Sequence, residues 1–307
     1  MLYTKALRSL RIAIDNAQEQ DLPYVWYTVM ILTLFELLST NDEPGWLWHA
    51  AGAARILYGV GAENIRSEFH LSLLAAQCRI QVTETLFNDK PCFLADSQWQ
   101  DAIRRTILKG DNFGDRSAVS TELWRIGASI PNAFRSVTEY VGDSRQFGRN
   151  RVLSFTVNIL RNMDTWEARW RPVLEMMCHN TFAEGGLRQQ SMSILLAFFM
   201  LSTILLRLRI AVGPYQAHNW ESRAQEACTN AFQHRLYATD FGMYDTEPLG
   251  VDGSIYLRVA VATQQTGSRW SKAVDGAGMG QCIDNDTFAE WSTSMRRTLA
   301  ASQENAA

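Results

Sequence analysis

The chain has 307 residues, with 29 Lys and Arg against 32 Asp and Glu, and therefore a formal net charge of −3. Its 47% hydrophobic and 20% charged residues are typical of a globular protein with a substantial core, and they exclude a disordered tail. The slight acidity argues against a free-standing nucleic-acid binder, which normally carries a clear basic surplus. The composition by itself indicates no reaction.

From its second residue the chain shows a helical pattern, with apolar residues recurring at three- and four-residue steps over residues 2–17. Residues 24–39 are apolar nearly all round, which predicts a central, buried helix. A turn of small polar residues, Pro and Gly separates this segment from the next helix. Further helices are expected over residues 46–58, 68–87, 120–140 with a break near Pro131, 149–176, 189–209, 220–239, 255–262 and 288–299.

Strand-like alternation bounded by hairpin dipeptides is nearly absent, so the predicted fold is all-α, with stacked antiparallel helices in an array like that of helical repeats. We expect one domain over residues 1–244. After it, the composition shifts to Gly, Ser, Thr and Asp. Residues 245–307 are therefore expected to form a looser segment whose short helices pack on the domain or are partly disordered.

Two apolar runs, residues 25–38 and 192–206, are candidates for membrane spans. Each has about 15 residues, whereas a bilayer needs roughly 20. We expect two buried helices and no membrane span, with an interfacial role of the second run as the alternative. The N-terminus also lacks the uninterrupted apolar stretch of a signal peptide.

Cysteines, histidines and known catalytic motifs indicate no chemistry. The five cysteines, at positions 78, 92, 178, 228 and 282, are odd in number and lack metal-ligand spacing, so buried free thiols and no metal site are expected. The nucleophile elbow, the phosphate-binding loop and the zinc motif His-Glu-x-x-His are absent. In Cys178-His179, adjacent side chains on a helix point roughly 100° apart, which favours a buried thiol beside a surface histidine over a catalytic pair. We therefore expect no catalytic residue and no cofactor.

His49 is the most informative histidine, because it lies three residues after Trp46 and three before Gly52, on a shared helix face. One interpretation is a packing motif in which the histidine bonds to a neighbouring carbonyl beside a bulky indole and a small notch. The alternative places His49 on the wall of an effector pocket, to which Glu36, Arg79 and His179 would contribute.

The same segment carries a family resemblance. Residues 45–57, Gly-Trp-Leu-Trp-His-Ala-Ala-Gly-Ala-Ala-Arg-Ile-Leu, resemble the "Gly-Trp-x-x-His-x-x-Gly-Ala-x-x-Leu-Leu" helix of the fungal-specific transcription factor domain, the regulatory domain that accompanies binuclear zinc clusters. The resemblance is strongest over residues 1–99. The other residues that follow the family's order are Tyr3, Ala6, Leu7, Leu10, Leu32, Leu34, Phe35, Glu36, Leu37, Phe69, Leu73, Arg79, Pro91, Phe93, Leu94 and Trp99.

This resemblance implies a transcription-regulator-like protein that is nuclear or nucleocytoplasmic and acts on a metabolic or secondary-metabolite gene cluster. The family's six-cysteine zinc cluster and basic linker are missing, so no direct sequence-specific DNA contact is expected from this chain alone. The resemblance further implies that the earliest helices of the family domain are not part of this chain. Their loss predicts an uncovered apolar face, and with it a protein partner or a homo-oligomer.

Two alternatives remain open. The first is a repurposed helical domain that binds or transforms a hydrophobic metabolite in a biosynthetic pathway. The second is a fragment of a longer transcription factor.

Overall fold

The computed structural model describes residues 2–38, 45–142, 148–180, 185–213, 217–240, 252–276 and 283–296. All regular structure in these ranges is helical, either α or short 3-10 turns, and none of it is a strand. The all-α prediction is therefore confirmed.

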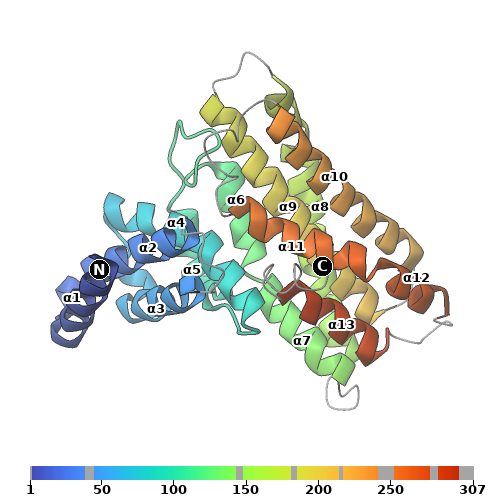
Figure 1. Cartoon of the computed structure of the whole chain (residues 1–307), viewed down its shortest axis with the longest axis horizontal. Coiled ribbons are helices and arrows are strands. Elements are labelled where there is room, and N and C mark those ends of the chain that lie inside the picture. Colours follow the sequence, from blue (N-terminus) through green and yellow to red (C-terminus); the bar gives the residue numbers. More distant parts are fainter. Residues whose placement is uncertain are drawn as a thin grey trace.

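The N-terminal helices project from one side of the molecule, at the left of Figure 1. They are α1 (Leu2–Asn16), α2 (Leu22–Leu38), α3 (Gly45–Val60), α4 (Glu68–Phe87) and α5 (Ser97–Arg104). Helix α4 begins where the Ser67 hydroxyl accepts a hydrogen bond from the His70 amide, as an N-cap residue does.

The rest of the chain forms a larger bundle built around long helices that run side by side (Figure 1). Its helices are α6 (Ala118–Gly127), α7 (Ile130–Gly142), α8 (Arg149–His179), α9 (Gly185–Val212), α10 (Ala217–Asp240), α11 (Asp252–Gln265), α12 (Gly267–Gly276) and α13 (Asn285–Arg296). Helix α9 is central and packs against α7, α8, α10 and α11.

The helix expected over residues 120–140 is two helices, α6 and α7, separated at residues 128–129. Pro131 lies in the first turn of α7, where its missing N–H leaves no intrahelical bond unmade. The break thus falls just before the proline, near its expected position. Helices α5 and α12 are short, and the sequence pattern did not predict them.

Helices α11–α13 pack against α7, α9 and α10 and insert two fully buried indoles, Trp270 and Trp291, into the core. The Trp291 indole N–H donates a hydrogen bond of 3.0 Å to the Thr263 hydroxyl. The domain boundary expected at residue 244 lies in residues 241–251, outside the described residues.

Residues 186–212 of α9 are long and apolar enough to cross a bilayer, but 94% of an apolar 18-residue stretch of this helix is buried inside the protein. Arg207, which is completely buried, lies within this helix. Its Nη2 atom donates to the Glu221 carboxylate of α10 at 2.8 Å, and its guanidinium lies 4.2 Å from the Trp270 ring centroid. Burial lowers the pKa of Arg207 to about 10, although the charge of Glu221 opposes this shift.

Replacing Glu221 with Ala leaves the Arg207 charge buried and without its carboxylate. We expect this variant to lose about 3–5 kcal/mol of unfolding free energy, and the double variant R207M/E221M to recover most of the loss. Urea unfolding of the single and double variants measures both. Glu139→Ala, which breaks the solvent-exposed pair with Arg135, is the control and should cost less than about 1 kcal/mol. Equal losses in the two single variants would contradict the prediction.

Candidate functional site

The outward face of α2 is a continuous apolar stripe. Four of its members follow one another at steps of three or four residues, a fifth is adjacent to the last of them, and all are between 40% and 68% exposed: Tyr24, Tyr27, Ile31, Leu34 and Phe35. The opposite face of the helix buries Val25, Trp26, Val29 and Met30 in the core. We call the exposed stripe, together with Phe69 of α4, the α2 face.

The prediction that this helix is central and buried is therefore wrong. Helix α2 packs mainly on α3, with smaller contacts to α1 and α4, and no described helix covers its outer side. The helix is apolar all round, yet the neighbours that the fold supplies cover one side of it. Large exposed apolar patches of this kind mark interaction surfaces.

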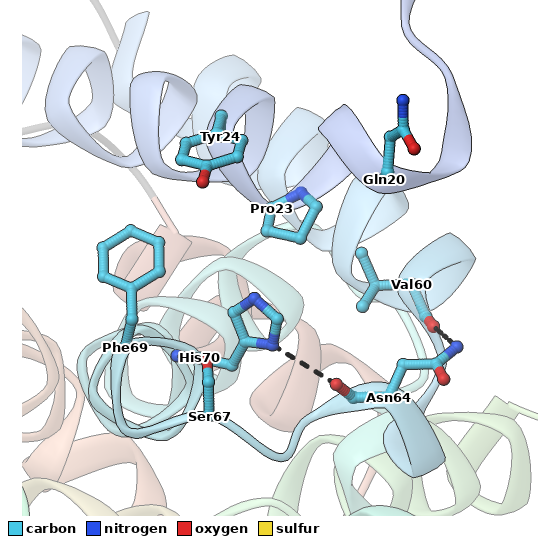
Figure 2. Close-up of a pocket in the computed structure, with 8 residues that line it drawn as sticks. All are labelled: Gln20, Pro23, Tyr24, Val60, Asn64, Ser67, Phe69 and His70. Atoms are coloured by element: carbon cyan, nitrogen blue, oxygen red, sulfur yellow. Dashed lines mark hydrogen bonds between the residues drawn. The ribbon is translucent and has the colours of Figure 1, made fainter.

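A cleft adjoins the N-terminal end of the α2 face, as Figure 2 shows. It has a volume of about 730 Å³ and lies between the start of α2, the end of α3 and the start of α4. Tyr24 and Phe69 stand on one side of it, and their ring centroids are 6.5 Å apart. The His70 ring lies at its centre, with Nδ1 3.2 Å from the Asn64 carbonyl oxygen. The stripe and the cleft share aromatic residues and form one surface.

At the other end of α2, three polar side chains from three helices meet. The Tyr3 hydroxyl of α1 lies 2.8 Å from Nε2 of His49 on α3, and Tyr3 also donates a hydrogen bond to Glu36 of α2. A phenol has one proton to donate, so with that proton directed to Glu36 the His49 Nε2–H donates to the Tyr3 oxygen. The Tyr3 ring also stacks on Phe35, with centroids 5.3 Å apart.

This cluster joins α1 to the α2–α3 pair. Burial, followed by the hydrogen bond and the charge of Glu36, raises the pKa of Tyr3 to about 12. Burial lowers the pKa of His49, and the Glu36 carboxylate partly opposes that change. Near neutral pH a protonated phenol and a neutral imidazole therefore face the carboxylate. The cluster holds three helices together and has no activated nucleophile.

The candidate residues taken from the sequence do not converge on one pocket. Glu36 and His49 are together, but Arg79 forms an ion pair of 3.5 Å with Asp115 at a separate cavity of about 220 Å³. His179 is exposed on α8, near His234.

Trp46 and Gly52 do not share a buried face with His49. Trp46 is buried, and the buried seam of α3 continues through Ala50, Ala53 and Leu57. Gly52 lines a groove of about 660 Å³ between α3 and α4, where an added Cβ would lie 3.9 Å from Val29. Repeated three-residue steps drift around a helix of 3.6 residues per turn, so they leave the seam, which alternates between steps of four and three residues.

The described cysteines behave as buried thiols. Cys78, Cys92, Cys178 and Cys228 are free and buried, and Cys282 lies outside the described residues. Burial raises the pKa of Cys178 to about 12, so this thiol is protonated at neutral pH. The described residues also contain no cluster of His, Cys, Asp and Glu that is suited to a metal ion.

Replacing Tyr3 with Phe removes the hydroxyl of the cluster and keeps the ring. We expect the variant to lose about 1 kcal/mol of unfolding free energy at pH 8. Because the pKa of Tyr3 is raised in the folded protein, its contribution is complete below pH 10 and is lost as the pH rises toward about 12. Urea unfolding from pH 8 to pH 11 should therefore show the wild-type advantage over Y3F shrinking above pH 10. An advantage that grows in this range would contradict the assignment.

Comparison with protein-family models, with curated proteins and with solved structures finds no match to this chain.

Proposed function

We propose that this chain is a regulatory protein that acts by binding another protein chain through the α2 face, without chemistry of its own. The observation that carries the proposal is the bare apolar stripe on α2, with the aromatic cleft beside it. Its residues repeat at the spacing that an apolar helix of a partner would match. Tyr24 and Tyr27 are of the residue type that most often anchors such contacts.

The size of the surface supports this role. Six large side chains that are each about half exposed present on the order of 500 Å² of apolar area. A standard interface buries about 800 Å² per partner, of which the centre is apolar and the rim polar. The α2 face has the extent of such a centre, and water in contact with it is unfavourable until a partner covers it.

The family resemblance supports the regulatory context. By that resemblance the protein acts on a metabolic or secondary-metabolite gene cluster in the nucleus or nucleocytoplasm, and it reaches DNA through a partner. The matching segments include α2, α3 and the Glu36–His49 pair. The partner is a second copy of this chain or a different protein.

Photo-crosslinking tests the binding surface. A benzophenone amino acid at position 31, on the α2 face, should give one dominant protein adduct in cells. The same probe at position 176 should not, although Met176 on α8 is also a highly exposed apolar residue, 62% exposed. Tyr27→Asp should abolish the adduct at position 31 and change the unfolding free energy by less than about 1 kcal/mol, because Tyr27 is partly exposed. Equal adduct yields at the two positions would contradict the proposal, and light scattering separates self-association from a different partner.

Transcript profiling tests the regulatory role separately. Cells carrying Tyr27→Asp should show a coordinated change in the transcripts of one gene cluster, matching the change in cells that lack the protein. Met176→Asp serves as the control and should leave these transcripts unchanged. If the crosslink is lost and transcription does not respond, the binding surface stands and the regulatory role is refuted.

A further inference from the structure

Another cavity lies away from the α2 face, between α5, α6 and α8. It has a volume of about 360 Å³, which is within the range of small-molecule sites. Its lining combines charged, amide, hydroxyl and apolar side chains: Gln100, Glu122, Arg125, Ile126, Ser129, Phe155, Asn158, Ile159, Asn162, Thr165, Trp166 and Arg169.

Arg125 is the unusual member of this lining. Its side chain is partly buried, and its Nε atom is shielded from water without a hydrogen-bond partner. No ion pair or hydrogen bond from its guanidinium to any described residue is present. Burial, and then the charge of nearby Arg104, lowers the pKa of Arg125, and the more distant carboxylates of Glu122 and Asp101 oppose this change without forming an ion pair with it. A partly desolvated cation without a partner is unfavourable, and a bound anion would relieve this cost.

The remaining charges of the cavity are committed to one another. Arg169 forms an ion pair of 3.2 Å with Glu122, and the Trp170 indole N–H donates to the same carboxylate at 2.8 Å. Among the lining residues, two arginines and one glutamate leave a net charge of +1, at Arg125. The cavity is therefore matched to a single negative charge. A dianion would be repelled by Glu122.

The walls separate into a polar part and an apolar part. Asn158, Asn162 and Thr165 follow one another on α8 at helical spacing and form the exposed, polar rim of the cavity. Ile126, Phe155 and Ile159 supply apolar surface. Gln100 donates hydrogen bonds to the Leu94 and Arg125 carbonyls and so fixes the backbone that carries the guanidinium. The lining thus offers one cation, two amides and an apolar wall.

We propose that this cavity binds a small organic monocarboxylate, with its carboxylate on the Arg125 guanidinium and its apolar body against Phe155 and Ile126. A guanidinium donates two parallel hydrogen bonds to a carboxylate, and the amides of Asn158 and Asn162 add polar contacts. This ligand site is independent of the partner-binding role proposed for the α2 face.

Calorimetric titration of the full chain with 3-phenylpropionate tests the site. We expect one binding event per chain, with at least tenfold weaker binding of 3-phenylpropanamide, which lacks the charge, and of acetate, which lacks the apolar body. Inorganic phosphate should also bind at least tenfold more weakly. No binding of 3-phenylpropionate, or equal binding of the amide, would overturn the proposal. Tighter binding of phosphate would overturn the ligand class.

Two variants locate the binding event. Arg125→Gln should weaken 3-phenylpropionate binding at least tenfold. Arg161→Gln removes the same charge from an exposed position of α8 outside the cavity lining, and should change binding less than threefold. Should the first variant fail to fold, Asn162→Trp, at an exposed lining position, fills the cavity and leaves Arg125 in place. Undiminished binding in the folded Arg125 variant, or in the Asn162 variant, would place the ligand elsewhere and refute the assignment.

Discussion

The larger bundle depends on the burial of α9 by the helices that surround it. This helix is apolar on every side, and it reaches a low free energy because α7, α8, α10 and α11 surround it. Arg207 lies within this apolar surface, where an unpaired charge would be too costly, and Glu221 on α10 supplies the opposite charge. The ion pair therefore constrains how α10 lies on α9. The indole ring of Trp270, on α12, packs against the Arg207 guanidinium.

Helix α2 is also apolar on all sides, but only one of its sides is buried. Helix α3 and parts of α1 and α4 cover one side of it, and the other side faces water. Two helices that are alike in sequence thus differ in the number of neighbours available to them. The proposed partner would cover the exposed side of α2, as α8, α10 and α11 cover α9. The Tyr3–Glu36–His49 cluster lies at the end of this surface and holds α1 beside it.

Part of the candidate site was predictable. Glu36 and His49, two of the candidate residues, lie together in the structure. Arg79 and Gly52 were not placed correctly, because a shared helical spacing or a shared family motif does not specify which helix lies opposite. The sequence marks Tyr3 only as one of the residues that carry the family resemblance. Its hydroxyl reaches His49 across 46 positions of sequence, and no local pattern encodes such a contact.

By itself the sequence determined most of the helical elements, the absence of strands from the described residues and the burial of the four described thiols. These properties follow from the local period of apolar residues and from turn residues, which act over a few positions. Tertiary structure decided which apolar faces are covered and which charges are paired. Arg207 lies in the apolar helix α9 and forms an ion pair with Glu221 of α10. Arg125 lies in α6, and its guanidinium forms no such pair with a described residue. The difference arises from contacts between distant helices, whose free energy depends on packing and desolvation that no short segment contains.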